Sequence, residues 1–317
     1  MTSDRFNSAL LPSVKKIVCD RVAKDVQGKT LTTFSIGGPC RAVVTVDNEQ
    51  ELQELLQFLH GEQQSVVTLG FGSNVLIPDS GVHGWVVRLG GSFRSSREVG
   101  SNTFCFGAGA SLMRESRRMS KEGFSGLEFA AGIPGSFGGG VYMNAGAHGS
   151  EISERVSFVR GFFKDGKYCE LRGDDLTWNY RCAGLPSSFI VTEVVMSLMH
   201  GDRDRINANC LNNLAHRKAT QPLSMPSAGS VFKNPSPTLS AGRVLEEVGM
   251  KGVAIGDVSI SDLHANWIVN PSKRGTARHV QELITYCRNQ AEQLAGVILE
   301  PEIRLWGYDS TNHEPAV

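Results

Sequence analysis

The chain has 317 residues, of which 40 % are hydrophobic and 20 % are charged, as in globular proteins large enough for two or three domains. Its 32 basic and 32 acidic residues balance, which argues against binding nucleic acid through bulk charge. The seven cysteines are scattered without a CxxC pair or a zinc spacing, and neither a signal peptide nor a membrane-length apolar run is visible. We therefore expect a cytoplasmic protein without a metal site or a membrane partner.

The N-terminal part predicts a strand–helix–strand unit that ends in a glycine-rich loop. Residues 1–30 are mixed and polar, and we expect a lead-in helix or arm there. Apolar runs predict strands, and a stripe of leucines closed by Gly61 predicts a helix between the first two of them. The expected elements are a strand at 42–46, a helix at 47–61, a strand at 65–69, the loop GFGSNVLI at 70–77 and a strand at 84–91.

A second segment starts near residue 92, and the composition changes again near residue 200. We expect a first domain over 31–200, with lobes at 31–91 and 92–200, a second domain over 201–307 and a disordered tail at 308–317. The expected elements of these parts are a strand at 103–109, a helix from Ser111 to Gly123, a hairpin turn at Asp165-Gly166, a strand at 188–199, a polar helix ended by Pro222, helices at 240–248 and 276–294, and a strand at 297–307.

The loop at 70–77 does not complete the Rossmann dinucleotide fingerprint. Val75 stands where the third glycine belongs, and Pro78 and Gly81 block the helix that should follow. On this loop alone, a tight turn is favoured over an anion-binding nest of backbone N–H groups. Eight glycines between 126 and 149, together with the stretch FSIGG at 34–38, change that balance, because they favour an elongated ligand lying along the backbone. A dinucleotide cofactor with a pyrophosphate fits this pattern.

Six motifs in one order then make a family resemblance visible: TTFSIGGP, LGFGSNVLI, GLEFAAGIPGSFGGGVYMNAGAHG, NYR, RKATQPLSMPSAGSVFKNP and HANWIVN. From about residue 31 to 307 the chain resembles the UDP-N-acetylenolpyruvoylglucosamine reductase (MurB) family. The resemblance implies an α+β fold, with a two-lobed FAD-binding domain of the vanillyl-alcohol-oxidase (PCMH) type followed by a smaller α+β substrate-binding domain. It also implies noncovalent FAD, NADPH as hydride donor, a sugar-nucleotide substrate and a place in peptidoglycan precursor synthesis. We expect a monomer that binds no nucleic acid.

The resemblance assigns FAD contacts to three glycine-rich segments, with the loop at 70–74 as the pyrophosphate loop. Relatives with covalent flavin often place a histidine in such a loop, and this loop has none, so a dissociable cofactor is expected. The implied cofactor-binding residues are Ile36, Gly37, Gly70, Gly72, Ser73, Asn74, Ile133, Pro134, Gly135, Asn144 and Gly146.

The implied reaction passes a hydride to the vinyl carbon of an enolpyruvyl ether, which leaves enolate character beside a carboxylate. Such charge needs a cationic or hydrogen-bonding partner, and the carbon needs a proton donor. The resemblance matches Arg181 to the family's catalytic arginine and Ser230 to the proton-donating serine. It matches Glu302 to the catalytic acid, because this residue directly precedes the I-R-x-x-G pattern at 303–307. Glu300 stays the alternative, because both glutamates share one face of the expected strand.

Further residues of the same motifs are implied substrate contacts, or have a structural reading. His264 is interpreted as structural, and the role of Asn266 stays open. Ala183 stands where the family often has serine, and no tyrosine-bearing insertion follows NYR, which indicates the shorter, second type of the enzyme. The implied substrate-binding residues are Arg217, Gln221, Lys233 and Asn234.

Two other interpretations compete with the reductase. One is another FAD-dependent oxidase or dehydrogenase of the same fold that acts on a sugar or alcohol. The other is a binding module that keeps nucleotide affinity without chemistry. The absence of a loop histidine and the presence of Arg181 and GSVFKNP argue against the first. The joint presence of Arg181, Ser230 and Glu302 argues against the second.

Overall fold

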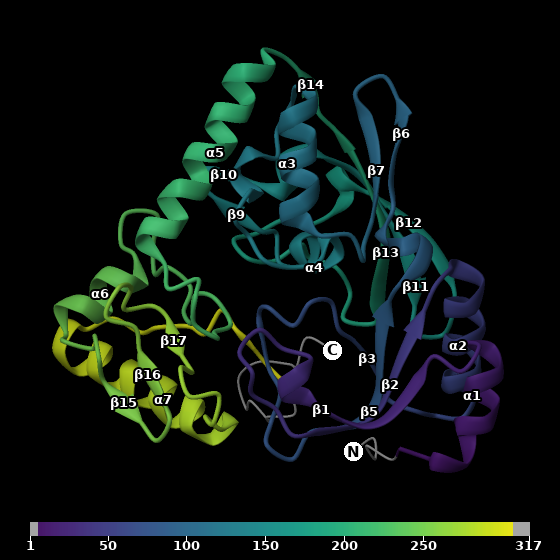
Figure 1. Cartoon of the computed structure of the whole chain (residues 1–317), viewed down its shortest axis with the longest axis horizontal. Helices are drawn as coiled ribbons and strands as arrows, with labels where there is room; N and C mark the ends of the chain where they lie inside the picture. The colour runs from purple at the N-terminus through teal and green to yellow at the C-terminus, as the bar shows by residue number, and fades with distance from the viewer. Residues whose placement is uncertain (1–5, 307–317) are drawn as a thin grey trace.

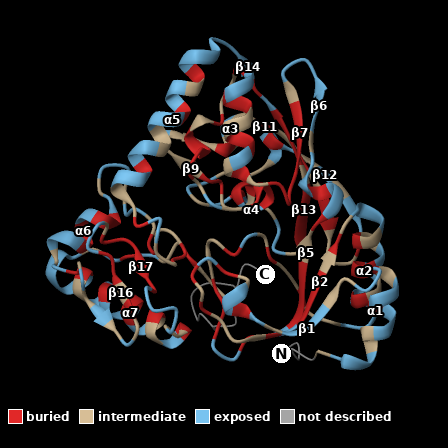
Figure 2. Ribbon diagram, in the orientation of Figure 1, coloured by how far each residue is buried: buried red, intermediate tan, exposed pale blue. Residues whose placement is uncertain are grey.

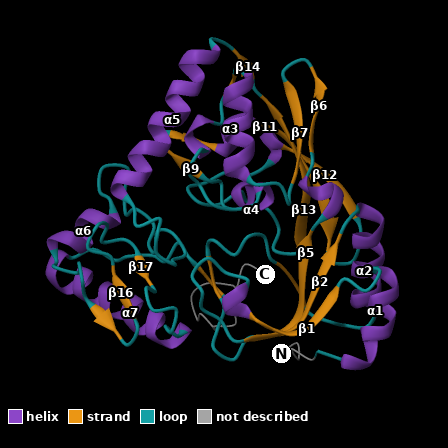
Figure 3. Cartoon of the chain, viewed as in Figure 1, coloured by secondary structure: helices purple, strands orange, loops and turns teal. Residues whose placement is uncertain are grey.

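A computed structural model describes residues 6–306, which form three parts (Figure 1). The first part is built from residues 8–89, the second from 91–200 and the third from 203–305. Figure 3 shows that helices and strands are mixed in each part and that long loops connect them near the middle of the molecule. The tail predicted at 308–317 lies outside the described residues.

The first part is a four-stranded sheet with strand order β1-β2-β5-β3. Its elements are α1 Leu11–Ile17, β1 Val22–Gln27, β2 Pro39–Val46, α2 Glu49–Gly61, β3 Val66–Thr68, β4 Val75–Leu76 and β5 Val82–Leu89. β5 is parallel to β2 and to β3, so the carboxyl ends of β3 and β5 meet at one edge of the sheet. The glycine loop leaves the sheet at this edge, where anion-binding loops of parallel sheets usually lie.

The sequence pattern explains why α2 covers this sheet. Asn48 caps the helix by accepting a hydrogen bond from the N–H of Glu51, and the four leucines of the predicted stripe are fully buried. They pack in one cluster with Trp85 and Val87 of β5. The predicted strands and helix of this part are thereby confirmed. The predicted lead-in contains the expected helix, but also β1, an unpredicted strand that pairs antiparallel with β2.

The second part is an antiparallel sheet of order β12-β11-β13-β7-β6, with α3 and α4 packed against it (Figure 1). Gly166 has φ +84° in the turn between β11 and β12, which confirms the predicted hairpin. Its elements are β6 Ser96–Gly100, β7 Thr103–Gly107, α3 Leu112–Glu122, β8 Phe124–Ser125, α4 Phe137–Tyr142, β9 Gly146–Ala147, β10 Ser150–Glu151, β11 Val156–Phe163, β12 Tyr168–Arg172, β13 Phe189–Ser197 and β14 Met199–His200.

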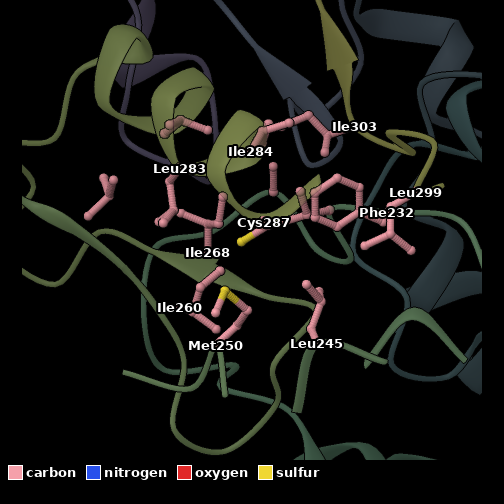
Figure 4. Close-up of a cluster of buried hydrophobic side chains, with 14 of the residues drawn as sticks. Phe232, Leu245, Met250, Ile260, Ile268, Leu283, Ile284, Cys287, Leu299 and Ile303 are labelled. Atoms are coloured by element: carbon pink, nitrogen blue, oxygen red, sulfur yellow. The ribbon is translucent and has the colours of Figure 1, made fainter. Parts of the chain in front are cut away.

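The third part begins with the long polar helix and ends in a short strand that returns to the first part. Its elements are α5 Arg203–Thr220, α6 Ala241–Glu247, β15 Ala254–Ile255, β16 Val258–Ile260, β17 Ile268–Val269, α7 Ala277–Ala295 and β18 Arg304–Leu305. Figure 4 shows the apolar core between α7 and the strands, which includes Leu283, Cys287 and Phe232. The three helices predicted here are confirmed. Within residues 6–306 the chain also forms 3₁₀ helices η1 Ser8–Leu10, η2 Gly28–Thr30, η3 Gly91–Arg94, η4 Glu128–Ala130, η5 Ile152–Arg155 and η6 Gly173–Asp175.

The strand predicted at 297–307 is wrong for most of its length. Of its described residues 297–306, only those of β18 form a strand, in parallel pairing with β4, and Pro301 makes an isolated bridge with Phe232. Pro301 has no N–H to donate to a ladder, so a regular strand cannot pass through it on the paired side. The segment nevertheless stays next to the loop that carries Ser230, which matters for the site.

The first and third parts are joined through a shared core and through side-chain caps. Phe34, Ile36 and Leu76 of the first part are buried in the core of the third. The carboxylate of Asp79 accepts hydrogen bonds from the N–H groups of Ala277 and Arg278 at the start of α7. Such a cap contributes about 1 kcal/mol. In Figure 2, buried residues continue from the strands into the loops near the middle of the molecule.

Candidate active site

A cavity of about 430 Å³ is lined by residues of all three parts. Its walls are the glycine loop after β3, the glycine-rich segment around α4, the ends of β5 and β13, the C-terminal end of α5 and the loop before β18. The predicted site residues that line it are Gly70, Gly72, Ser73, Asn74, Ile133, Pro134, Gly135, Gly146, Arg181, Arg217, Gln221, Ser230 and Glu302.

Two glycine-rich segments from different lobes touch each other at this cavity. A Cβ on Gly70 would lie 2.3 Å from the hydroxyl oxygen of Ser136, and one on Gly72, which has φ +64°, would lie 2.2 Å from the carbonyl oxygen of Leu31. A larger residue at position 70 would push the two segments apart, and one at position 72 would clash with the backbone of the first part. The hydroxyl of Ser73 donates to the carbonyl of Pro134 at 2.8 Å and ties the segments together. Backbone therefore lines the cavity directly, as a bound phosphate requires.

Three of the predicted cofactor residues do not line the cavity. Ile36 is buried in the core of the third part, and Gly37 packs closely against Gly28 and Ile77. Asn144 is fully buried, and its side chain donates to the carbonyl of Asn179 at 3.1 Å. These residues hold the backbone that surrounds the cavity.

Arg181 is placed by a tight turn and by an ion pair. Asn179 and Cys182 exchange backbone hydrogen bonds of 2.8 and 3.0 Å, and Arg181 takes φ +60° between them. A left-handed conformation in a non-glycine residue costs about 1 kcal/mol, so the turn needs outside support. Asn144 gives that support at Asn179, and the Nε of Arg181 donates to Glu302 Oε1 at 2.9 Å.

The two glutamates that the sequence could not separate lie in different environments. Glu302 lines the cavity, and burial raises the pKa of its carboxyl group, although Arg181 and Lys233 oppose the rise. Glu300 does not line the cavity, and its partly exposed carboxylate bonds to Lys233 Nζ at 2.6 Å. Lys233 and Asn234 are also not among the residues of the cavity wall. The side chain of Asn234 instead accepts a hydrogen bond from the N–H of Ala241 at the start of α6.

The loop that carries Ser230 is held by backbone pairing on both sides. The N–H of Glu302 donates to the carbonyl of Val231 at 2.7 Å, and Val231 N–H donates to the carbonyl of Asn266 at 2.9 Å. The side chain of Asn266 binds both the N–H and the carbonyl of Phe232, at 2.9 and 2.8 Å. Asn266, whose role the sequence left open, thus fixes the backbone two residues beyond Ser230.

His264 is confirmed as a structural neighbour of this loop rather than part of the cavity wall. Its Nδ1 accepts a hydrogen bond from the N–H of Asn266 at 3.2 Å. Its ring packs on Gly242, where a Cβ would lie 2.8 Å from the imidazole carbon. Burial lowers the pKa of the imidazole and favours its neutral form.

Four unpaired polar atoms in the cavity wall indicate that a polar ligand belongs there. Among the described residues, six buried side-chain nitrogen or oxygen atoms have no hydrogen-bond partner, and four of them belong to residues that line this cavity. Buried polar groups are normally paired, so this concentration needs an explanation. The four atoms are Thr68 Oγ1, Arg217 Nε, Gln221 Oε1 and Trp267 Nε1.

The charge of the wall indicates an anionic ligand. Of the described residues that line the cavity, six are cationic and one, Glu302, is a carboxylate, so the wall has a formal charge of +5. Burial and repulsion from Arg181 lower the pKa of the Arg217 guanidinium to about 10. The six cations are Arg88, Arg94, Lys164, Arg181, Arg217 and Arg304.

Several of these wall residues were missed by the sequence reasoning. Arg88, Arg94 and Lys164 belong to none of the motif positions that the resemblance used, and each is a single cation in its own segment. Arg304 is the arginine of the I-R-x-x-G pattern that aligned Glu302, but no role was assigned to it. Tyr142 and Trp267 also line the wall; both stand inside motifs that carried the resemblance, but neither was assigned a role from the sequence. The guanidinium of Arg304 lies 5.7 Å from the centre of the Tyr142 ring, a cation–π distance that the spacing along the chain could not predict.

The residues present fit FAD. A backbone cradle without side chains, unpaired polar atoms and excess positive charge together suit an elongated group with a diphosphate. A family model described as "FAD binding domain" matches residues 40–172, which span both lobes. The chain is therefore a flavoprotein built on a two-lobed FAD-binding domain, and the predicted fold class is confirmed.

The particular family follows from the rest of the chain. A model described as "UDP-N-acetylenolpyruvoylglucosamine reductase, C-terminal domain" matches residues 221–306. UDP-N-acetylenolpyruvoylglucosamine reductase 2 of Symbiobacterium thermophilum is 40 % identical over 95 % of this chain and 98 % of its own length. The Bacillus subtilis reductase is 36 % identical over 87 % of this chain and 91 % of its own. The chain belongs to the UDP-N-acetylenolpyruvoylglucosamine reductase family, as the motifs predicted.

A solved structure agrees with this assignment. The reductase (MurB) of Thermus caldophilus superposes with a TM-score of 0.79 at 35 % identity, over 90 % of this chain and 99 % of that one. The protein is thus an FAD-dependent oxidoreductase of peptidoglycan precursor synthesis. Within residues 6–306, no helix is both long and apolar enough to cross a membrane.

Proposed function

We propose that the protein reduces UDP-N-acetylglucosamine enolpyruvate to UDP-N-acetylmuramate with NADPH as the electron donor, and that Ser230 donates the proton. Bound FAD supplies the hydride that reaches the vinyl carbon of the substrate. The observation that supports this reaction best is the meeting of Arg181, Ser230 and Glu302, from three separate segments, in the wall of the same cavity as the glycine loop.

Arg181 is suited to hold the substrate carboxylate and to stabilise the enolate that develops beside it. Its Nε is used by Glu302, which leaves the other guanidinium nitrogens for the substrate. Glu302 orients that guanidinium. Burial raises the pKa of the Glu302 carboxyl group, so its protonation depends on the charge of the ligand that binds beside the pair. Glu302 is therefore the better candidate of the two glutamates for the catalytic acid.

Ser230 is suited to donate the proton because its hydroxyl is free to point into the cavity. No described residue forms a hydrogen bond with the Ser230 side chain, whereas its backbone pairs with Trp267. A serine hydroxyl is a weak acid, but a carbon with enolate character beside a carboxylate is basic enough to take the proton when the two are aligned. Addition of one hydride and this proton saturates the double bond.

Arg217 and Gln221 are proposed contacts to the sugar nucleotide. Arg217 is 9 % exposed with an unpaired Nε, and Gln221 has an unpaired Oε1 one turn further along. A buried unpaired guanidinium fits an anionic group of the substrate. The absence of a tyrosine-bearing insertion after NYR supports the shorter type of the enzyme. In this proposal, Arg217 and Gln221 supply part of the sugar-nucleotide binding that such an insertion would give.

The test separates the two halves of the reaction in Ser230→Ala. An anaerobic stopped-flow trace follows the oxidised-flavin absorbance while NADPH is added, followed by the enolpyruvyl sugar nucleotide. We expect bleaching at the wild-type rate and a recovery slowed by at least a hundredfold. Ser227→Ala is the matched control, because Ser227 lies three residues earlier and is not among the cavity-lining residues. Equal loss of both steps in Ser230→Ala would contradict the proton-donor role.

A further inference from the structure

Four cations of the cavity wall take no part in the reaction described above, and three of them belong to the FAD-binding domain. Arg88 is the next-to-last residue of β5, Arg94 ends η3, and Lys164 follows β11 in the other lobe. Their elements carry none of the catalytic residues. Because these cations come from different lobes, a ligand that binds all three must bridge the lobes.

Arg88 and Arg94 lie beside the glycine cradle. The N–H of Leu69, which begins the glycine loop, donates to the carbonyl of Val87 at 2.9 Å, so Arg88 follows the residue paired with the loop. A Cβ on Gly109 would lie 3.4 Å from Cγ of Arg94, and Gly109 is itself part of the wall. The backbone of these two cations is therefore fixed next to residues that line the cavity.

Lys164 approaches from the second lobe. Its N–H donates to the carbonyl of Ser188 at 2.9 Å, which places it beside the start of β13, and Ile190 and Val191 of that strand line the same cavity. Lys164 is half-buried, and burial lowers the pKa of its amine to about 8. A cation in such surroundings is costly unless an anion accompanies it.

No acidic side chain compensates these charges within residues 6–306. None of the three forms an ion pair with a described residue, and the single carboxylate of the wall, Glu302, is engaged by Arg181 at 2.9 Å. Burial and the nearby charge of Arg94 also lower the pKa of the Arg88 guanidinium. Arg94 is exposed to solvent, whereas Arg88 and Lys164 are half-buried without an anionic partner among the described residues. A bound anion would supply that partner.

We propose that Arg88, Arg94 and Lys164 form a side-chain half of the site that binds the FAD diphosphate, opposite the backbone N–H groups of residues 70–74. The proposal rests on FAD binding and on the reductase function proposed above. The diphosphate is the charged group of FAD at neutral pH, since the adenosine and flavin rings are neutral. Arginine forks bind phosphate oxygens in pairs, and lysine adds a point charge.

The proposal gives the cofactor a structural role. Arg88 belongs to the sheet of the first lobe and Lys164 to the sheet of the second, so an anion held by both ties the lobes together. The hydroxyl of Ser73 makes a similar link to Pro134. We therefore expect a diphosphate compound to stabilise the cofactor-free protein more than the same compound without phosphates.

The experiment compares ADP with adenosine on the protein freed of FAD, by calorimetric titration. We expect ADP to bind the wild type at least tenfold tighter than adenosine. Arg88→Gln and Lys164→Met should each weaken ADP and FAD about tenfold or more and leave adenosine unchanged, since one charge-assisted contact has about that value. Lys164→Arg should restore most of the loss. The matched control is Lys167→Met, because Lys167 lies in the same hairpin with its amine paired to Asp165 at the surface.

Two results would overturn the proposal. One is equal weakening of ADP and adenosine in Arg88→Gln and Lys164→Met, which would mean that the cations contact the adenosine. The other is unchanged ADP affinity in both variants. Failure of the wild type to bind FAD would instead contradict the flavoprotein assignment, and normal FAD binding without substrate reduction would contradict the proposed function alone.

Discussion

The side chain of Asn266 gives the sharpest prediction about how the catalytic loop is held. It accepts a hydrogen bond from the N–H of Phe232 and donates one to the carbonyl of the same residue, at 2.9 and 2.8 Å. Phe232 is 1 % exposed and Asn266 3 % exposed, so water cannot replace these bonds without opening the loop. Asn266→Ala therefore leaves two buried backbone groups unpaired.

The expected cost follows from those two groups. Each unpaired buried donor or acceptor costs about 1–3 kcal/mol, so Asn266→Ala should lower the free energy of unfolding by about 4 kcal/mol. The same value corresponds to roughly a thousandfold faster hydrogen exchange at the Phe232 amide if opening is local. Hydrogen–deuterium exchange read by NMR measures that amide directly, and urea unfolding followed by tryptophan fluorescence gives the global change.

The matched control is Asn213→Ala, which removes a single partly buried bond from the Asn213 amide to the carbonyl of Glu128 and should cost about 1 kcal/mol. Asn266→Ala should also slow substrate reduction, since Ser230 loses its position, while FAD affinity stays at the wild-type value. An unchanged exchange rate at Phe232 together with an unfolding free energy within 1 kcal/mol of wild type would refute this reasoning.

Three further predictions follow from the cavity wall. Glu302→Gln should slow substrate reduction at least tenfold in a steady-state assay and Glu300→Gln less than twofold, because the Glu302 carboxylate binds Arg181; equal losses would contradict this. Arg217→Met should raise the free energy of unfolding of the ligand-free protein by about 1–2 kcal/mol, because it removes a buried unpaired charge. The same substitution should weaken sugar-nucleotide binding. A lower free energy of unfolding would contradict this. The pKa of the Lys164 amine, about 8, should rise when an anion binds, because the anion stabilises the charged amine. FAD affinity, measured by flavin fluorescence, should therefore be highest below about pH 8 and fall toward pH 9. Lys164→Arg should remove this pH dependence.

Local patterns predicted the elements whose stability is local. The leucine stripe defines α2 in the sequence, with Asp47 or Asn48 as the possible cap, and the structure has the stripe buried and Asn48 as the cap. Ser111 and Gly123 bound α3, and Gly123 takes the left-handed φ of +84° that ends helices. The missing third glycine in 70–77 correctly excluded a Rossmann loop, because no helix follows it.

Non-local pairing explains the failures. β1 was not predicted, because its residues do not alternate between buried and exposed. Its pairing with β2 is what makes it a strand. The predicted strand at 297–307 is apolar and extended, but Pro301 and the partner loop at 231–233 limit its pairing to isolated bonds. For β1 the partner strand decides the outcome, and for 297–307 the missing N–H of Pro301 and the partner loop decide it together.

The site residues also separate into those that the sequence could place and those that it could not. Motifs located the residues that line the cavity on the glycine loops and around Arg181 and Ser230. The same motifs also contain residues such as Asn144, whose side chain holds the turn of Arg181 and does not reach the cavity wall. A motif keeps such residues together because they fix one backbone conformation, so position in a motif does not by itself separate contact from support.

The cations of the wall could not be recognised as ligand-binding residues from the sequence, because each stands alone in its own segment. Their effect appears only when the fold brings them together. A lone arginine near the end of a strand is usually a solvated surface residue, so Arg88 has no signal of its own. Assembled from separate segments, the cations give the wall a formal charge of +5, which is unfavourable in a partly buried cavity without anions. The proposed ligands, a flavin dinucleotide and a sugar nucleotide with a carboxylate, bring two diphosphates and one carboxylate. Neither ligand alone balances the wall. A cavity of this charge therefore suits a reaction in which cofactor and substrate are held at the same time, each reducing the repulsion that the other would leave.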